Sequence, residues 1–171
     1  MSDAPGTRYA RQTVLAEVGA AGQAKLAAAT VLVVGAGGLG CPVVQYLAGA
    51  GVGRLIVVDH DTVEESNLHR QPLYAMADIG ASKAEAARAA IARFNPAVTV
   101  DAVVERLTPQ NAGRLVARAD IVIDAADSFA VTYILSDVCQ AAGKPMISAS
   151  VIGLSGYVGV FCGGGPSYRA V

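Results

Sequence analysis

The chain has 171 residues, of which 53% are hydrophobic and 16% charged, and its formal net charge is −1. This length fits one domain with a substantial core, and a chain with so much apolar surface is not disordered. Because 13 basic residues stand against 14 acidic ones, no basic field exists to hold a phosphate backbone, and we expect no nucleic-acid partner.

In chain order, the sequence predicts alternating helices and strands with short connections. We expect helices over 9–15 and 22–29, a strand over 30–34, a helix over 38–50, a strand over 54–58, a polar loop over 59–71, a helix over 82–94, a strand over 98–104, a helix over 109–118, a strand over 121–123, a helix over 129–142, and strands over 145–150 and 156–161. Strand–helix repeats of this kind predict a Rossmann-like α/β fold with a doubly wound, mostly parallel sheet.

These elements suggest a single domain with three parts. Residues 1–29 would form an N-terminal helical segment, residues 30–150 the Rossmann-like core, and residues 151–171 the start of further strands. The long uncharged stretches are interrupted by glycines, so we expect buried strands rather than membrane spans. The N-terminus is polar and shows no secretory signal, and the three cysteines form no disulfide framework. We therefore expect a cytoplasmic protein.

A glycine-rich loop follows the first predicted strand and opens a helix. Gly35, Gly37, Gly38 and Gly40 are its glycines. In this context the loop predicts a phosphate held by backbone N–H groups at a helix N-terminus. Asp59 ends the second strand, where a carboxylate can accept both ribose hydroxyls. The pattern indicates a nucleotide but does not distinguish NAD from ATP, and the same glycines could instead serve close helix–strand packing.

Two further carboxylates, Asp124 and Asp127, follow the fourth predicted strand. In a doubly wound sheet the ligand crevice opens where the strand order reverses, between the first and fourth strands. We therefore expect both carboxylates to face the same crevice as the glycine loop. For Asp124, a structural role in capping the next helix is an equal alternative.

The loop over residues 59–71 carries the most specific pattern, D-x-D-x-V-x-x-S-N-L-x-R-Q. Together with the R-Y-x-R-Q opening at 8–12, Lys83 and Asp127, it resembles the ThiF/MoeB/HesA family of ubiquitin-activating-like adenylyltransferases over nearly the whole chain. The resemblance implies an ATP-dependent homodimer that adenylates the C-terminal Gly-Gly carboxylate of a small ubiquitin-like sulfur-carrier protein. The reaction would serve thiamine or molybdopterin synthesis and release magnesium pyrophosphate.

The resemblance also assigns roles to individual residues. Arg70 and Lys83 would place positive charge on the phosphates, and Asp127 would hold Mg²⁺. Arg11 would reach the ATP of a neighbouring subunit and complete the catalytic set. The implied ATP-binding residues are Gly35, Gly37, Gly38, Gly40, Asp59, Asp61, Ser66, Asn67, Leu68, His69, Arg70, Lys83, Asp127 and Ser128.

Each of these residues also has an ordinary structural explanation. Arg11 could lie along the surface of its own helix, and Lys83 could be a solvated helix lysine. Arg70 could form an exposed ion pair with an acidic neighbour in the same loop, and such a pair would contribute little to the stability of the protein. His69 is more simply a loop residue, because the implied reaction needs no titrating imidazole.

Three features depart from the family pattern. Ser128 and Thr132 stand where the family has Asn and Arg, which puts phosphate or substrate handling near this helix in doubt. Ser167 and Ala170 replace the cysteines of a P-C-Y-R-C run, so we predict no structural zinc. The sequence ends before the family's usual C-terminal part. We expect the apolar edge over 158–161 to pair with another subunit or chain.

Two other functions are consistent with part of the pattern. An NAD-dependent oxidoreductase or sensor domain would explain the glycine loop and Asp59 but would leave Arg70, Lys83 and Asp127 without a task. A catalytically impaired nucleotide-binding core is suggested by Thr132 and the short C-terminal part. Magnesium-dependent ATP binding separates the adenylyltransferase from the first alternative, and pyrophosphate exchange separates it from the second.

Overall fold

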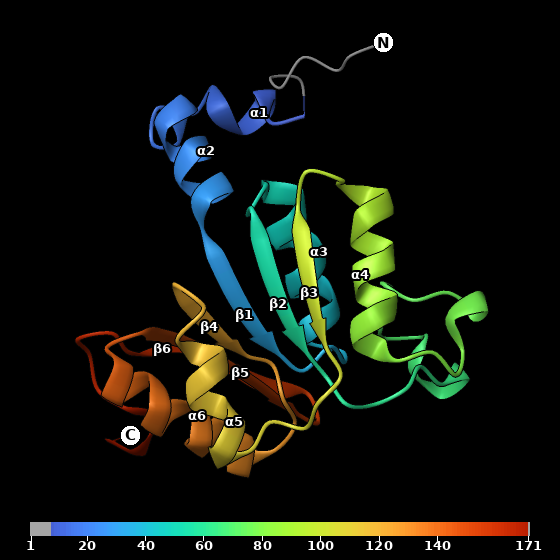
Figure 1. Cartoon of the computed structure of the whole chain (residues 1–171), viewed down its shortest axis with the longest axis vertical. Helices are drawn as coiled ribbons and strands as arrows, with labels where there is room; N and C mark the ends of the chain where they lie inside the picture. Colours follow the sequence, from blue (N-terminus) through green and yellow to red (C-terminus); the bar gives the residue numbers. More distant parts are fainter. Residues whose placement is uncertain (1–7, 171) are drawn as a thin grey trace.

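Six strands form one sheet with helices on both faces in the computed structural model, which describes residues 8–170 (Figure 1). The strands are β1 (Thr30–Val34), β2 (Arg54–Val58), β3 (Thr99–Val103), β4 (Ile121–Asp124), β5 (Pro145–Ile152) and β6 (Ser155–Cys162). Their order across the sheet is β3-β2-β1-β4-β5-β6. All neighbouring pairs are parallel except β5 and β6. The predicted doubly wound, mostly parallel sheet is therefore confirmed.

The helices are α1 (Ala10–Thr13), α2 (Gly19–Ala28), α3 (Gly40–Ala50), α4 (Lys83–Phe94), α5 (Pro109–Val116) and α6 (Phe129–Ala142). Three short 3₁₀ helices lie at Glu65–Asn67, Met76–Asp78 and Tyr168–Ala170. Most predicted boundaries shift by one to three residues. The second helix begins earlier than expected, and β5 runs past residue 150, so the proposed end of the core falls inside a strand.

The two central strands alternate their side chains between two cores. Val31 and Val33 of β1 pack with α3 and α4 on one face, whereas Leu32 and Val34 face α5 and α6 on the other. Strands buried on both faces in this way read as continuous apolar runs. Burial of the strands on both faces therefore explains why these stretches of the sequence carry no charge. None of the described helices is long and apolar enough to cross a membrane.

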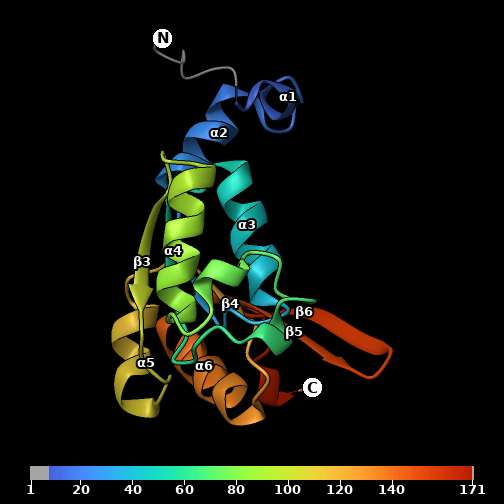
Figure 2. The same ribbon diagram turned by 90° about the vertical axis from the view of Figure 1, so that its right-hand side faces the viewer.

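The hairpin of β5 and β6 projects beyond the rest of the sheet (Figure 2). Its tip exposes Ile152 and Leu154, and β6 also exposes Val158 and Val160. Phe161, which we expected on the same apolar edge, is instead buried against the second core. β6 forms one edge of the sheet and leaves an apolar strand accessible.

The register of β1 and β4 sets the position of the site. Val34 pairs with Asp124, so the loops that follow these two neighbouring strands begin at the same level of the sheet. The backbone N–H groups of Gly35 and Ala125 continue the ladder by donating to the carbonyls of Val58 and Val34. The crevice therefore opens between the first and fourth strands, as predicted.

The packing predicts a contrast between two leucine-to-alanine substitutions. Leu32 is fully buried in the centre of β1, so Leu32→Ala should lower the free energy of unfolding by about 2–5 kcal/mol. Leu154 is fully exposed at the hairpin tip, and Leu154→Ala should change it by less than about 0.5 kcal/mol. Urea unfolding followed by circular dichroism measures both. Equal losses would contradict this description of the core.

Candidate functional site

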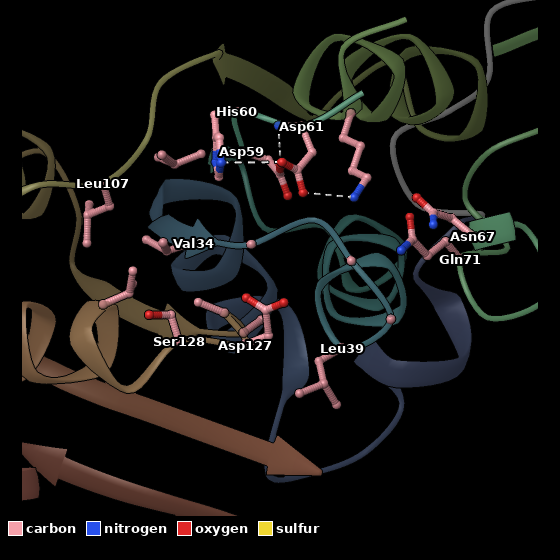
Figure 3. A pocket seen from close by; sticks show the side chains of 18 of the residues that line it. Val34, Leu39, Asp59, His60, Asp61, Asn67, Gln71, Leu107, Asp127 and Ser128 are labelled. Atoms are coloured by element: carbon pink, nitrogen blue, oxygen red, sulfur yellow. Dashed lines mark hydrogen bonds and ion pairs between the residues drawn. The ribbon is translucent and has the colours of Figure 1, made fainter. Parts of the chain in front are cut away.

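A pocket of about 790 Å³ lies at the carboxyl ends of the central strands (Figure 3). Its volume suits a nucleotide. The walls come from the glycine loop after β1, the polar loop after β2, the start of α4, and the segments after β3 and β4. The apolar lining includes Val34, Leu39, Val58, Leu107, Val131 and Val151, whereas most other side chains of the lining are polar or charged. This division between apolar and polar lining suits a nucleotide, which joins a flat apolar base to charged phosphates.

Two glycines allow the tight turn of the glycine loop. Gly35 has a φ of 92°, and a Cβ there would lie 2.6 Å from the carbonyl oxygen of Ala125. A Cβ on Gly40 would overlap with the carbonyl oxygen of Gly35. Only glycine fits at both positions, so the loop can close on itself before α3 begins. Gly37 and Gly38 then line the pocket, where their backbone can approach a ligand closely.

Buried side chains hold the peptide groups of Ala36 from both sides. The Asp59 carboxylate accepts a hydrogen bond from the Ala36 N–H at 2.7 Å, and the Tyr74 hydroxyl donates to the Ala36 carbonyl at 2.8 Å. The second oxygen of Asp59 accepts the Asp61 N–H at 2.8 Å. Burial raises the pKa of Tyr74, which keeps its hydroxyl a donor. Asp59 lines the pocket as predicted, but it also anchors two loops.

The ammonium group of Lys83 lies at the polar end of the pocket. Its side chain is only 9% exposed, and Nζ lies 3.3 Å from the Asp61 carboxylate. The idea of an ordinary solvated helix lysine is therefore wrong. Figure 3 shows Asp61 above the glycine loop together with this ion pair. An incoming anion could compete with the exposed Asp61 for the same ammonium group.

Arg70 packs across the glycine loop. Its aliphatic carbons lie 3.6–3.7 Å from the position of a Cβ on Gly38. Between residues 8 and 170, no acidic group lies within ion-pair distance of its guanidinium, so the alternative of a pair with Glu64 or Glu65 is not realised. Asn67 lies in the same wall. The Asn67 amide donates to the Ser66 hydroxyl at 3.3 Å, whereas the Arg70 guanidinium keeps its donors free of ion pairs among residues 8–170.

Asp127 and Ser128 line the pocket, but Asp124 does not. Asp124 accepts hydrogen bonds from the Thr132 and Ser148 hydroxyls at 2.7 and 2.8 Å, beneath α6. Burial raises the pKa of its carboxyl group, and these hydrogen bonds lower it in part. The prediction that both carboxylates face the crevice is therefore wrong for Asp124. The Asp124 carboxylate is held by hydroxyls of α6 and β5, whereas the three residues that follow it, Ala125, Ala126 and Asp127, line the pocket.

Thr132, which stands where the family pattern has Arg, is buried with Asp124. It lies outside the pocket lining. The departure at this position thus changes a buried hydrogen-bond network. The pocket lining gives no support to the concern that this departure alters phosphate handling, nor to the part of the impaired-core alternative that rested on Thr132.

Five predicted site residues lie outside the pocket lining: Arg11, Gly40, Ser66, Leu68 and His69. Gly40 shapes the turn, Leu68 packs against the core, and Ser66 and His69 are exposed on the loop. Arg11 is exposed on α1, at the opposite end of the sheet from the glycine loop (Figure 1). It does not reach the pocket of its own chain.

Sequence reasoning also missed several residues that line the pocket. The apolar wall includes Leu107, which follows β3, and Ser150 and Val151 come from β5. No spacing pattern singles these positions out, because tertiary folding alone brings them to the crevice. Gln71 is different, since it belongs to the quoted loop pattern, and its place directly after Arg70 was a usable signal.

The residues present fit a magnesium ion beside bound phosphates. Asp127 offers an exposed carboxylate without an ion-pair partner among the described residues, and Mg²⁺ prefers one or two carboxylates plus phosphate oxygens. Asp59, His60 and Asp61 also bring possible ligand atoms within 4.8 Å of one another. However, Asp59 already accepts two N–H groups and Asp61 pairs with Lys83. Asp127 is therefore the better ligand.

Comparison with known proteins places this geometry in a family. The ThiF family model matches residues 9–171. The chain belongs to the ThiF family. It is 52% identical over 165 residues to the Bos taurus "adenylyltransferase and sulfurtransferase MOCS3", covering 96% of this chain and 36% of that protein. It is 44% identical to the Haloferax volcanii "SAMP-activating enzyme E1", covering 96% of this chain and 61% of that enzyme.

Solved structures agree with the fold. The structure of PaaA superposes with a TM-score of 0.87 at 27% identity, covering 100% of this chain and 56% of PaaA. The E. coli tRNA N6-threonylcarbamoyladenosine dehydratase TcdA, solved in complex with ATP, superposes with a TM-score of 0.80 at 30% identity, covering 86% of this chain and 60% of TcdA. The chain thus spans about a third to two thirds of the length of these relatives.

The buried network predicts a pH-dependent effect of Thr132→Val. Loss of one hydroxyl donor should raise the pKa of Asp124 further and lower the free energy of unfolding by about 1–3 kcal/mol at neutral pH. Because folding raises the pKa of Asp124, the folded state loses stability as the pH rises past this pKa and the carboxyl group ionises. The deficit should therefore be smaller at mildly acidic pH than at neutral pH, because Asp124 takes up a proton as the pH falls.

Urea unfolding at both pH values measures this deficit. Thr99→Val is the matched control, because Thr99 is exposed on the edge strand β3 and should change the free energy of unfolding by less than about 0.5 kcal/mol. A deficit for Thr132→Val that is equal at both pH values would contradict the role assigned to Asp124.

Proposed function

We propose that this protein is an ATP-dependent adenylyltransferase that activates the C-terminal Gly-Gly carboxylate of a small ubiquitin-like sulfur-carrier protein. The observation that carries the proposal is the buried Lys83 ammonium facing one pocket with Arg70, the glycine loop and Asp127. A nicotinamide cofactor would give no task to these three charged groups. The names of the relatives, which include an adenylyltransferase and a SAMP-activating enzyme, support the same activity.

The reaction requires charge neutralisation rather than a protein nucleophile. An oxygen of the substrate carboxylate forms a bond to the α-phosphorus of ATP, while the bond between that phosphorus and the bridging oxygen breaks. The electron pair leaves with pyrophosphate, and an acyl-adenylate remains. Negative charge grows on the leaving group, so preorganised cations and N–H donors around it stabilise the transition state.

The pocket distributes these tasks among its residues. The backbone of Gly37 and Gly38 would approach the phosphates, and Lys83 and Arg70 would balance their charge. Asp127 would hold Mg²⁺, which shields the leaving pyrophosphate when it is bound. Asp59 retains lone pairs beyond the two that its N–H partners use, so it can still accept from the ribose.

The carrier tail would enter from the side of β5. Ser150 and Val151 line the pocket on this side, and the same strand continues into the exposed apolar hairpin. A narrow tail without side chains, such as Gly-Gly, suits an approach beside the glycine loop. We assign the reaction to thiamine or molybdopterin synthesis in the cytoplasm.

Exchange of labelled pyrophosphate into ATP in the presence of a Gly-Gly carrier protein tests the reaction. We expect exchange with the wild-type chain and a loss of about 100-fold or more in Asp127→Asn, because the leaving group loses its metal ligand. Asp137→Asn is the matched control, since Asp137 is exposed on α6 outside the pocket. Exchange that survives in Asp127→Asn would overturn the metal assignment.

We further propose that Arg11 acts on the ATP of a partner subunit in a homodimer. Its position on α1, away from its own pocket, supports action in trans. Arg11→Ala and Arg70→Ala chains should each be inactive alone. When the two variants are mixed in equal amounts, half of the dimers contain one chain of each kind. Each of these dimers has one intact site out of two, so the mixture should regain about a quarter of wild-type activity. No recovery in dimers shown to exchange subunits would exclude action in trans.

A further inference from the structure

One face of the β5–β6 hairpin is left uncovered by the described part of the chain. Phe161 points to the other face, where α6 packs on β4, β5 and β6. Side chains alternate along a strand, so Val151, Val158 and Val160 belong to the uncovered face, and they are 61–73% exposed. Ile147, on the same face, packs against the core that includes α3. The hairpin thus presents an apolar sheet surface to solvent on the side of α3.

α3 extends the uncharged character of this side. Its 11 residues, Gly40–Ala50, include no charged side chain, and Tyr46 is 79% exposed. The hairpin strands, Pro145–Ile152 and Ser155–Cys162, also lack charge. An exposed helix face ordinarily carries polar or charged residues, and burial does not account for the absence of charge at positions that face solvent. Exposed apolar side chains on neighbouring uncharged elements are typical of a surface that binds another protein.

The position of Arg11 indicates which protein this is. α1 lies at the opposite end of the sheet from the glycine loop (Figure 1). If Arg11 completes the site of a second copy, a two-fold dimer must place the α1 end of each chain beside the pocket end of the other. The two chains then run in opposite directions and meet along one long side of the molecule.

The two long sides differ in chemistry (Figure 2). The side of β3 and α5 carries ion pairs of Asp101 with Arg54 and Arg118. The other side is formed by α1, α3 and the hairpin, and on α1 and just after it Val14 and Leu15 are exposed. Depletion of charge is the compositional mark of an interface centre, and two copies of an uncharged surface meet without repulsion between like charges. The second side is therefore the one suited to a second copy.

We infer that the α3–hairpin surface, which comprises Tyr46, Val151, Val158 and Val160, is the contact surface of a two-fold homodimer. Val151 also lines the pocket, so a copy seated on this surface lies beside the ATP site. A contact between faces buries the exposed valines, whereas pairing along the edge of β6 alone would leave most of their surface in water. The inference rests on the proposed function, because that function takes Arg11 from a partner.

Sedimentation velocity over a range of protein concentrations tests the inference. We expect a dimer for the wild-type chain and a rise of about 100-fold or more in the dissociation constant of Val158→Lys, because a two-fold contact buries the new charge twice. Val104→Lys is the matched control, since Val104 is 49% exposed directly after β3, on the charged side. It should dimerise as the wild-type chain does. Circular dichroism should show both variants folded, since each lysine replaces an exposed side chain.

An engineered thiol gives a second measurement. The three cysteines of the chain, Cys41, Cys139 and Cys162, are buried, so Val158→Cys adds a single exposed thiol. We expect its reaction with Ellman's reagent to slow as the protein concentration rises and the dimer forms. Val104→Cys, on the charged side, should react at the same rate throughout.

A wild-type chain that stays monomeric would overturn the inference, together with the action of Arg11 in trans. A dimer whose affinity is unchanged in Val158→Lys, or a Val158→Cys thiol that reacts equally at all concentrations, would overturn the surface assignment and leave the proposed reaction standing. Loss of carrier-protein binding in Val158→Lys with the dimer intact would assign the surface to the carrier instead. A dimer that is sensitive to Val158→Lys but catalyses no pyrophosphate exchange would contradict the proposed function and not the surface.

Discussion

One buried carboxylate, that of Asp59, fixes the geometry on which the site depends. Its two oxygens accept N–H groups from Ala36 in the glycine loop and from Asp61 in the polar loop. Both oxygens of this buried side chain are thereby satisfied by backbone N–H donors. Together with the Tyr74 hydroxyl, which donates to the Ala36 carbonyl, this link fixes the loop after β1 relative to the segment after β2.

The charged groups gain their function from this shape. Because Asp61 is anchored through its backbone, its side chain can hold the Lys83 ammonium in a position that is largely shielded from water. Arg70 lies across Gly38 from the same polar loop, and Asp127 approaches from the loop after β4. Cations on one side and the Asp127 carboxylate on another surround a space suited to phosphates, whereas the apolar wall suits a base.

The sequence predicted the fold because the central strands β1, β2 and β4 are mostly apolar runs, and local signals such as the glycine loop before α3 and the proline at the start of α5 mark where helices begin. It also predicted ten of the residues that line the pocket, from Gly35 to Ser128. It failed for Asp124, because a one-residue change along a strand reverses the face of the side chain. It could not find Leu107 or Ser150, since distant segments bring them to the pocket, nor the burial of Lys83, which depends on how the polar loop folds back.

The central claim is that this pocket holds ATP rather than a nicotinamide dinucleotide. Titration calorimetry of the purified chain with Mg·ATP and, separately, with NAD tests it most directly. We expect binding of Mg·ATP with no measurable binding of NAD, because Lys83, Arg70 and Asp127 match a magnesium triphosphate. Binding of NAD alone would contradict it, and would mean that these charged residues serve the structure of the loop.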